Sequence, residues 1–566
     1  MDIDVVRCRL SMARGRSKAD LVFKNGRVVN VFTGEVVEAD VAVSGDQIVG
    51  VGRYSGHREI DLQGRYLCPG FIDAHVHLES TMLAPARVVM SALARGTTTF
   101  IADPHEAANV AGLAGIKYIL DQTENIPANV LVMMPSCVPA TAEEDNGSHL
   151  SVHEMAEMAG HPRLLGLGEV MDFVSVIEGD ADMFAKLDLF AGRAIDGHAP
   201  ALSPEDLSAY VFSGIASDHE VDSFADALRK RRAGLQVLIR QGTAAHNLPD
   251  VVTGLLASGI DTAGFSFCTD DKDIIDIERE GHIDHNVRLA VALGLDPVKA
   301  IQMATINTAR HYGLRRLGGI APGYQADLLV LDDLRRLSVK AVFHRGREVT
   351  PGWPEVVRPT PEELKRSVKV AADFQNKLSL YSSGGDIRVI RLLEGQIVTS
   401  SEMASLEHRD GIALASKEYN KVAVIERHKG SGRVGVGFVA GFGLENAALA
   451  TSVGHDSHNI IVVGDNDPDI IRAVEAIIAM QGGLAISSGG RTKMTLPLPV
   501  MGLISEETPA VVQSRLQEMK LLAKTLGVNE NVDPFLTLSF IALPVIPELR
   551  ITTRGLFDVI KRAYHY

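Results

Sequence analysis

Eight short apolar runs alternate with helix-like segments between residues 70 and 312, and this rhythm constrains the fold more than any other feature of the sequence. Strands that are joined by helices run parallel within one sheet, and eight such units over about 250 residues are typical of a (β/α)8 barrel. Helical patterns are predicted at 85–94, 204–210, 221–232 and 297–312. The predicted strands are 70–77, 97–103, 129–135, 164–170, 194–198, 214–219, 235–240 and 264–270.

Two segments with alternating apolar and polar residues flank this region. Residues 20–66 contain turn signals such as Asn25-Gly26 and Thr33-Gly34, and the same pattern returns at 325–349. Alternation of this kind indicates antiparallel strands, so we expect both segments to form one split β-sandwich. A proline-containing boundary around Trp353 precedes a region of mixed strands and helices. The predicted domains are an N-terminal part of the β-sandwich (1–68), the barrel (69–320), a C-terminal part of the β-sandwich (321–355) and a C-terminal α/β domain (356–566).

The amino-acid composition indicates which classes of binding partner the protein is not expected to have. The 566 residues carry a formal net charge of -15, and aromatic residues make up 5% of the chain. A surface of this charge repels phosphate backbones and offers few rings for base stacking, so we expect no nucleic-acid partner. Four scattered cysteines without a C-x-x-C pair fit a reducing compartment. There is no apolar run of about 18 residues and no apolar signal core at the N-terminus, so we expect a cytoplasmic protein without a membrane partner.

Candidate metal ligands stand at the ends of the predicted barrel strands. Barrel enzymes place their chemistry at the C-terminal ends of the strands. His75 and His77 end the first strand, and their side chains point the same way because side chains alternate along a strand. We expect His75, His77 and Asp270 to hold one ion, His198 and His219 to hold a second, and Glu169 to bridge the two.

Each ligand also has a plainer structural explanation. A single histidine near a strand end is more often a hydrogen-bonded surface or core group, and Asp270 could cap the next helix. Glu169 is harder to explain in this way, since an unpaired acid beside the apolar run 164–167 is costly to bury. All six residues in order at strand ends favour a metal centre. Two close divalent ions acidify a water between them and polarise the group that it attacks, which indicates hydrolysis at carbon or phosphorus.

These residues resemble a known family. PGFIDAHVH at 69–77, followed by Glu169, His198, His219 and Asp270, resembles the amidohydrolase superfamily over about residues 20–350. Six short segments are similar to the bacterial adenine deaminases: FIDAHVHLEST, DPHE at 103–106, PSCVPA at 135–140, DGHAP at 196–200, CTDD at 268–271 and EGHID at 280–284. GFGLENAALATSVGHDSHNI and LPLPVMGLIS resemble the C-terminal domain of that family. Many binuclear relatives bridge their metals with a carboxylated lysine, whereas Glu169 stands at the corresponding position here.

The resemblance implies hydrolytic conversion of adenine to hypoxanthine and ammonia in purine salvage. It favours two Mn²⁺ or Fe²⁺ ions per chain over Zn²⁺, and it implies a homodimer. We expect Asp270 to take a proton from the attacking water and Glu220 to protonate the purine ring, with His105 and Glu106 as alternatives for that step. The predicted substrate contacts are Arg240, Asp271, Ser136 and Asp103.

Several alternatives stay open at this point. The metal ligands alone would also suit another binuclear amidohydrolase, such as a cyclic-amide hydrolase or a deacetylase. A non-catalytic scaffold is the less favoured reading. His105 and Glu106 could cap a helix after Pro104. The segment 454–459, GHDSHN, could close over the barrel mouth or bind another ion, but a plain polar turn is the favoured interpretation.

Overall fold

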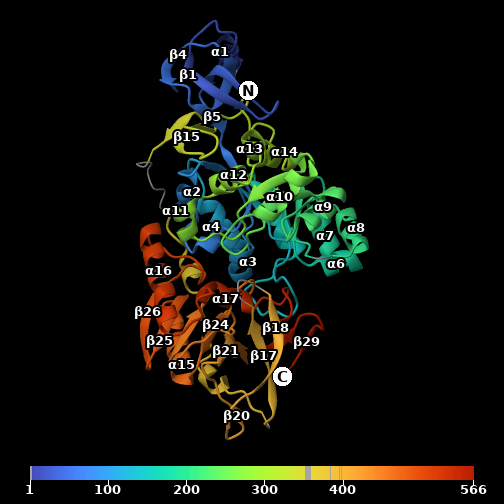
Figure 1. The fold of residues 1–566 in the computed structure, drawn as a ribbon, viewed down its shortest axis with the longest axis vertical. Coiled ribbons are helices and arrows are strands. Elements are labelled where there is room, and N and C mark those ends of the chain that lie inside the picture. Colours follow the sequence, from blue (N-terminus) through green and yellow to red (C-terminus); the bar gives the residue numbers. More distant parts are fainter. Residues whose placement is uncertain are drawn as a thin grey trace.

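The structure is a computed structural model, and it describes residues 3–200, 202–350, 358–382, 384–393, 396 and 398–565. Three parts follow one another along the long axis in Figure 1: an N-terminal sheet in blue, a barrel, and a C-terminal sheet domain in orange and red. The predicted boundary between residues 355 and 356 lies outside the described residues. The four domain limits stay predictions.

The N-terminal sheet joins the two flanking segments. Its strands run in the order β16-β15-β14-β5-β1-β2-β3, with β4 paired to β1. Phe23 of β1 and Phe343 of β15 pack edge to face with ring centroids 4.8 Å apart, so the sheet curls over its own core. An exposed helix, α1 (Ile3–Ala13), lies beside it. The strands are β1 (Ala19–Asn30), β2 (Glu35–Ser44), β3 (Gln47–Gly52), β4 (Gly56–Asp61), β5 (Tyr66–Pro69), β14 (Leu328–Leu331), β15 (Val339–His344) and β16 (Arg347–Val349).

The chain between β5 and β14 contains all eight predicted barrel strands. They form a five-stranded parallel sheet, β10-β9-β8-β7-β6, and a three-stranded parallel sheet, β11-β12-β13. The strands are β6 (Phe71–Val76), β7 (Thr97–Ala102), β8 (Asn129–Met134), β9 (Leu164–Val170), β10 (Ala194–Gly197), β11 (Ser217–Asp218), β12 (Gln236–Arg240) and β13 (Phe265–Cys268).

Backbone hydrogen bonds close the barrel between the two sheets. The N–H of Ala216 donates to the carbonyl of Ile195 over 2.9 Å, which joins β11 to β10. On the other side, the N–H of Asp270 donates to the carbonyl of His75, and the N–H of His77 donates to the carbonyl of Asp270, over 3.0 and 3.2 Å. Three predicted metal ligands, His75, His77 and Asp270, therefore lie at the seam of the barrel.

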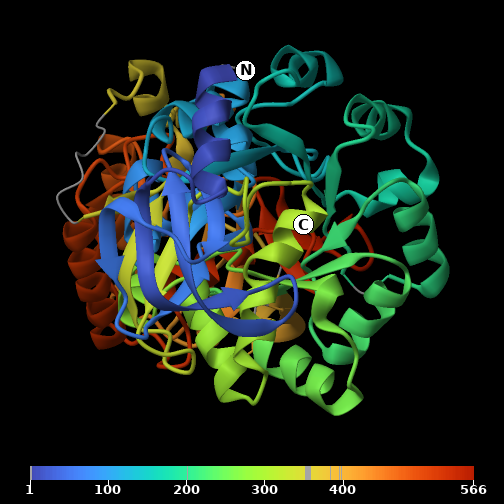
Figure 2. The same cartoon turned by 90° about the horizontal axis from the view of Figure 1, so that it is seen from above.

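Helices surround the strands, as the view from above shows (Figure 2). The predicted helix at 297–312 is two helices, because the carbonyl of Ala304 accepts a hydrogen bond from the N–H of Ile72 and Thr305 leaves the helical conformation at φ -143° and ψ -91°. The helices are α2 (Pro85–Leu93), α3 (His105–Ala111), α4 (Leu113–Gln122), α5 (Val152–Met158), α6 (Phe173–Glu178), α7 (Ala181–Leu189), α8 (Pro204–Phe212), α9 (Phe224–Arg232), α10 (Leu248–Ser258), α11 (Ile274–Glu280), α12 (Ile283–Ala292), α13 (Pro297–Met303) and α14 (Ile306–His311).

The C-terminal domain is built on an eight-stranded sheet in the order β18-β17-β22-β21-β24-β23-β25-β26. Two short groups, β19–β20 and β27–β29, stand apart from it. Its elements are β17 (Asp386–Leu392), β18 (Thr399–Ser405), β19 (His408–Arg409), β20 (Ile412–Ala413), β21 (Tyr419–Ile425), β22 (Val434–Ala440), β23 (Ala447–Thr451), β24 (Ile460–Gly464), α15 (Asp467–Ala479), β25 (Gly483–Ser488), β26 (Arg491–Pro497), α16 (Pro509–Thr525), α17 (Pro534–Ile541), β27 (Leu549–Thr552), β28 (Gly555–Asp558) and β29 (Ala563–Tyr564).

One apolar core spans the barrel and the C-terminal domain. Leu83 and Val88 beside and within α2 belong to the same buried cluster as Ile461 and Val463 of β24. The N–H of Ser505 also donates to the carbonyl of Met82 over 2.8 Å. Figure 1 shows α3 facing the C-terminal domain next to α17. The end of the barrel that carries the predicted ligands is therefore covered by the C-terminal domain.

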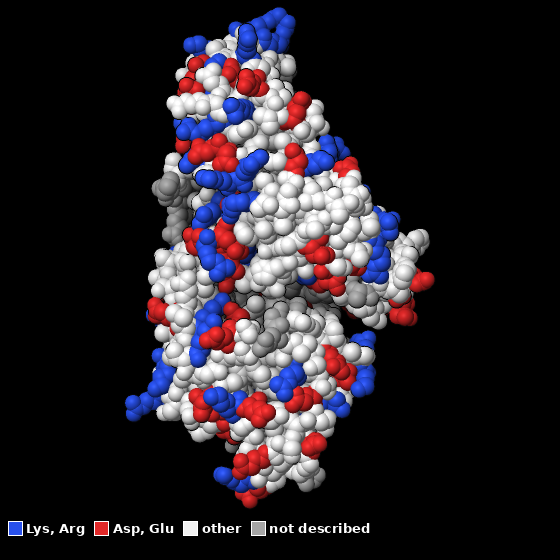
Figure 3. Space-filling model, viewed as in Figure 1, with Lys and Arg blue, Asp and Glu red and all other residues white. Residues whose placement is uncertain are grey.

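The outer surface gives no sign of a polymer or a bilayer partner on the face that Figure 3 shows. Lysine and arginine are mixed with aspartate and glutamate there, and no continuous basic track crosses it. Among the described residues, none of the helices has the length and the apolar composition that crossing a membrane requires.

Candidate metal centre

Four predicted ligands surround one point at the seam of the barrel. Nε2 of His75 and Nε2 of His77 lie 3.1 Å apart, and Oδ1 of Asp270 lies 3.5 and 3.1 Å from them. Oε1 of Glu169 lies 3.3 Å from Nε2 of His77 and 3.7 Å from Nε2 of His75. A tetrahedral ion with bonds of about 2.1 Å has ligand atoms separated by about 3.4 Å. The four atoms therefore have the spacing of one metal shell.

The other oxygen of Glu169 faces a second pair of ligands. Oε2 lies 2.7 Å from Nδ1 of His198 and 3.2 Å from Nε2 of His219. One carboxylate thus divides its two oxygens between two groups of imidazoles. This is the arrangement that the sequence predicts for a bridging ligand.

Neighbouring groups fix the orientation of these ligands. Nδ1 of His77 lies 2.9 Å from the carbonyl oxygen of Asp103, which can only accept, so Nδ1 donates and Nε2 keeps its lone pair for a cation. The carboxylate of Asp103 accepts from the N–H of Glu169 over 2.9 Å. A side chain at Gly168 would overlap that carboxylate, which explains the glycine before Glu169. Asp270 itself has φ +57°, a backbone conformation that few non-glycine residues adopt.

The donor set fits a divalent cation. No hydrogen bond from the described residues reaches Oε1 of Glu169, although the side chain is only 3% exposed. Leaving a buried carboxylate oxygen without a partner is costly, and a cation at the spacing above would satisfy it. Imidazole nitrogen together with carboxylate oxygen suits zinc, manganese and iron.

The centre is electrostatically arranged to keep its carboxylates ionised. Burial would raise the pKa of Glu169, but the imidazoles of His219, His105 and His198 hold that pKa well below its usual range. Burial has the same effect on Asp270, and His75, His77 and Arg240 outweigh it. Ionised carboxylates are the form that binds metal.

Glu220 and Arg240 form an ion pair at the edge of the centre. Nη2 of Arg240 lies 3.3 Å from Oε2 of Glu220, Nη1 contacts Oε1 of Glu220, and Nη1 also lies 3.3 Å from Oδ2 of Asp270. Burial would raise the pKa of Glu220, but Arg240 and His198 lower it. Oε1 of Glu220 lies 3.9 Å from the ligand atoms of both His198 and His219. A carboxylate at this place can exchange a proton with a substrate that reaches the centre.

The other predicted substrate contacts differ in what they touch. The Ser136 hydroxyl donates to the carbonyl of Glu169 over 2.6 Å, so Ser136 and Asp103 both contact the backbone of the bridging ligand. Asp271 accepts from Ser80 and lines a cavity between the barrel and the C-terminal domain, together with His455. Arg240 and Asp271 are thus the two predicted substrate contacts that are not fully buried.

His105 and Glu106 lie between the centre and the C-terminal domain. Nδ1 of His105 is 3.1 Å from Oε1 of Glu169. Glu106 contacts His455 and His458 of the loop between β23 and β24. Pro104 is the N-cap of α3 and no side chain caps this helix, so the capping alternative for His105 and Glu106 is wrong. The interpretation of 454–459 as a plain polar turn is also wrong, because this loop reaches the barrel.

Two groups of functional neighbours escaped the sequence prediction. The first is the contact of the 454–459 loop with the barrel, because the favoured interpretation of this loop was a plain polar turn although its H-D-x-H spacing was an available signal. The second is Lys230, which lies among basic residues at the end of α9 but is fully buried and pairs with Asp218 over 3.0 Å. Asp218 precedes the ligand His219, and its carboxylate also accepts from the N–H of Glu220 over 2.7 Å. Nothing in the local sequence distinguishes Lys230 from its exposed neighbours.

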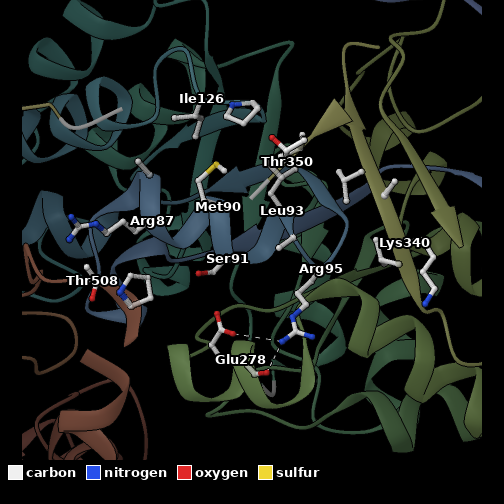
Figure 4. A pocket seen from close by; sticks show the side chains of 18 residues that line it. Arg87, Met90, Ser91, Leu93, Arg95, Ile126, Glu278, Lys340, Thr350 and Thr508 are labelled. Carbon is white, nitrogen blue, oxygen red and sulfur yellow. Dashed lines mark hydrogen bonds and ion pairs between the residues drawn. The ribbon is translucent and has the colours of Figure 1, made fainter. Parts of the chain in front are cut away.

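A large groove elsewhere on the barrel contains none of the predicted site residues. It measures about 690 Å³ and is lined by α2, β15 and residues near Pro509. Figure 4 shows Arg95 and Glu278 paired at its edge, with Met90, Leu93 and Ile126 in its wall. The chemistry of the ligands thus places the candidate site at the strand ends and not in this groove.

Comparison with known proteins agrees with the family resemblance that the sequence motifs indicate. Residues 66–349 match the sequence model of the amidohydrolase family, and residues 396–563 match that of the adenine deaminase C-terminal domain. The chain is 51% identical over 550 residues to an adenine deaminase of Desulfitobacterium hafniense (strain Y51), which covers 97% of each chain. It is 43% identical over 565 residues to an adenine deaminase of Kosmotoga olearia, which covers 98% of this chain and 97% of the relative.

Proposed function

The chain belongs to the adenine deaminases of the amidohydrolase family, and on that premise we propose that its buried centre hydrolyses adenine to hypoxanthine and ammonia. The observation that supports the proposal is that the two oxygens of Glu169 divide the five other predicted ligands into two groups. A rival binuclear amidohydrolase would share the ligands. The match over residues 396–563 favours adenine over the substrates of such a rival.

The cofactor in this proposal is a pair of divalent metal ions, with Mn²⁺ or Fe²⁺ favoured over Zn²⁺. His75, His77 and Asp270 would hold one, His198 and His219 the other, and Glu169 both. The bound ions lower the pKa of water and polarise the carbon that it attacks.

Asp270 and Glu220 move the protons in this proposal. Water adds to C6 of adenine as Asp270 accepts one of its protons, and Glu220, which is ionised before the reaction, receives this proton from Asp270 and delivers it to the adjacent ring nitrogen. Arg240 contacts both carboxylates and holds them next to each other, and it keeps its own proton throughout. The remaining proton of the water then passes to the exocyclic amine, the C6–N bond breaks, and ammonia leaves. General acid–base transfer of this kind contributes about 10²–10⁴ in rate.

The other predicted residues have supporting roles. Arg240 and Asp271 face the substrate, whereas Asp103 and Ser136 act through Glu169 by fixing its backbone. His105 and Glu106, the alternatives for ring protonation, face the C-terminal domain and are not needed for that step. This assignment leaves Glu220 as the acid.

The exposed apolar side chains and the cysteines of the enzyme bear on its oligomeric state and its cellular compartment. We propose a cytoplasmic homodimer whose only partners are adenine and a second copy of the chain. All four cysteines are unpaired, which fits a reducing compartment. Phe212 is 92% exposed and is among the apolar side chains that offer contact area for a second copy. Light scattering of the purified protein measures the assembly directly.

A substrate panel tests the activity. Chelator-stripped protein is reloaded with Mn²⁺, Fe²⁺ or Zn²⁺ and assayed for ammonia with adenine, and for the ring-opened acid with hydantoin and dihydroorotate. We expect ammonia from adenine and no ring opening of the two cyclic amides. Ring opening without adenine turnover would identify the rival hydrolase. Fewer than about one ion per chain, together with no turnover of any substrate, would identify a non-catalytic scaffold.

A further inference from the structure

A second cluster of metal-binding side chains lies outside the centre that the proposed reaction uses. The β23–β24 loop brings His455, Asp456 and His458 against His105 and Glu106 of α3. Nδ1 of His455 contacts Oε1 of Glu106, and Nε2 of His458 contacts Oε2 of the same carboxylate. All five side chains are buried. Figure 1 shows α3 at the border between the barrel and the C-terminal domain.

Four atoms of this cluster lie close to the spacing of a metal shell. Nε2 of His105 lies 3.4 Å from Oε1 of Glu106 and 3.8 Å from Oδ1 of Asp456. Nδ1 of His455 lies 4.0 Å from Oδ1 of Asp456 and in contact with Oε1 of Glu106. A tetrahedral ion with bonds of about 2.1 Å needs separations of about 3.4 Å. Small side-chain adjustments would bring all four atoms to that distance.

Histidines contact both oxygens of Glu106, but one carboxylate oxygen of the cluster lacks the partner that burial requires. Asp456 is 4% exposed, yet no hydrogen bond from the described residues reaches its Oδ2. The nearby Glu144 is also buried, and burial together with the charge of Asp456 raises its pKa to about 8, so it adds no charge to the cluster at neutral pH. Throughout the described ranges, no lysine or arginine forms an ion pair with Glu106, Asp456 or Glu144. Buried carboxylates are normally paired or coordinate metals, so the missing group is a cation.

We propose that His105, Glu106, His455 and Asp456 hold a third divalent metal ion where the barrel meets the C-terminal domain. Two imidazole nitrogens and two carboxylate oxygens suit Mn²⁺, Fe²⁺ or Zn²⁺. His458 orients Glu106 from the opposite side through Oε2. Neither the ligand set nor its location depends on which substrate the barrel centre takes.

The third ion joins two parts of the chain and touches the barrel centre through one ring. Two of its ligands come from α3 and two from the C-terminal loop, so binding favours the docked arrangement of the two parts. His105 would use Nε2 for this ion while its Nδ1 lies 3.1 Å from Oε1 of the bridging Glu169. When an imidazole binds a metal through one nitrogen and contacts a carboxylate through the other, the contact fixes the orientation of the ring and affects how strongly it binds the metal.

Counting metal ions tests the proposal. The full chain is stripped with chelator, reloaded with excess Mn²⁺ alone, desalted and analysed for metal per chain. We expect about three ions in the wild-type protein and one fewer in Glu106→Gln and in His455→Gln. His408→Gln is the matched control, because His408 on β19 is a histidine of the same domain outside the cluster, and it should keep the wild-type count.

The barrel centre is measured separately in the same experiment. His198→Asn removes a barrel ligand and leaves the cluster intact, so its count reports on the proposed deaminase centre alone. A wild-type count of two, or an unchanged count in both cluster variants, overturns the third site and would show that protonated imidazoles neutralise Glu106 and Asp456 instead. Anomalous scattering at the manganese edge from wild-type crystals needs no variant. A peak between His105, Glu106, His455 and Asp456 is the expected result, and its absence overturns the proposal.

Discussion

At the scale of single residues, Glu169 and Asp270 determine what the centre can do. Glu169 divides its oxygens between two groups of histidines, and Asp270 combines a ligand oxygen with a contact to Arg240. Both carboxylates are buried and ionised, and the neighbouring imidazoles and Arg240 outweigh the cost of burial. In the proposed mechanism, proton transfer and metal binding are therefore linked at Asp270.

Asp270→Asn separates these two roles. The amide cannot accept a proton from water, so we expect kcat to fall by at least about 10³ while adenine still binds. Equilibrium dialysis with labelled adenine and metal analysis of the variant accompany the rate measurement. A rate close to that of the wild type would remove Asp270 from the mechanism.

Lys230 gives a prediction about stability. Its ammonium group and the carboxylate of Asp218 are both fully buried and 3.0 Å apart. Lys230→Met leaves Asp218 charged without its partner, which costs about 3–5 kcal/mol in comparable buried pairs. We expect a clear drop in the melting temperature of the stripped protein. Arg232→Met, in the same helix but exposed, is the control and should melt with the wild type.

At the scale of elements, the ends of β14 and β15 are held to the barrel by one carboxylate. Asp327 accepts hydrogen bonds from Asn129 and Gln325 over 2.8 Å and from the N–H of Arg345 over 2.9 Å, and His344 lies 3.1 Å away. Burial would raise the pKa of Asp327, but His344 and these hydrogen bonds lower it. Asp327 thus connects the inserted barrel to the split sheet, and the negative charge of its carboxylate stabilises this connection.

The contribution of Asp327 to the free energy of unfolding depends on pH in a direction that its pKa shift determines. Since the folded pKa of Asp327 is lowered, its contribution to stability is complete above the unfolded pKa of about 3.9 and is lost as pH falls through the folded value. Asp327→Asn should therefore lower stability at pH 7 by about 1–3 kcal/mol, and the difference from the wild type should shrink below about pH 4. Thermal unfolding across that range measures it.

Asp332→Asn is the matched control for this connection. Asp332 follows β14 directly and pairs with Arg65 and Lys340 at the surface. Exposed pairs contribute little, so the melting temperature of the control should follow that of the wild type at every pH. A gap between Asp327→Asn and the wild type that widened in acid would contradict the assignment.

The elements were largely predictable from sequence, and the long-range contacts were not. His75 and His77 could be placed because side-chain alternation and the position of barrel chemistry are general rules. The break at Thr305 could not, since it depends on a hydrogen bond between Ala304 and Ile72. Glu106 and His458 are 352 residues apart, so no local pattern reports their contact. Lys230 is indistinguishable in sequence from its exposed neighbours.

At the scale of the whole molecule, the C-terminal domain completes the barrel. Its β24 shares an apolar core with α2, and its β23–β24 loop contacts α3 beside the metal centre. A chain that ended at residue 350 would expose buried side chains such as Leu83 and Val88. The two parts therefore form one folding unit around the site.

Truncation tests this dependence. We expect residues 3–350 expressed alone to aggregate or to bind a hydrophobic dye, because exposed apolar area of this kind drives association. Co-expression with residues 358–566 as a separate chain should restore solubility in part. A truncated chain that is soluble, monomeric and active on adenine would contradict the shared core as a requirement for the site.

Ammonia release from adenine by Mn²⁺-loaded wild-type protein and by Glu169→Gln tests the central claim most directly. The glutamine keeps the size of the side chain but loses the charge that two cations would share. We expect ammonia and hypoxanthine in equal amounts from the wild type, and a rate at least about 10² lower in the variant, with less metal bound. No ammonia from the loaded wild type, or a wild-type rate in Glu169→Gln, would contradict it.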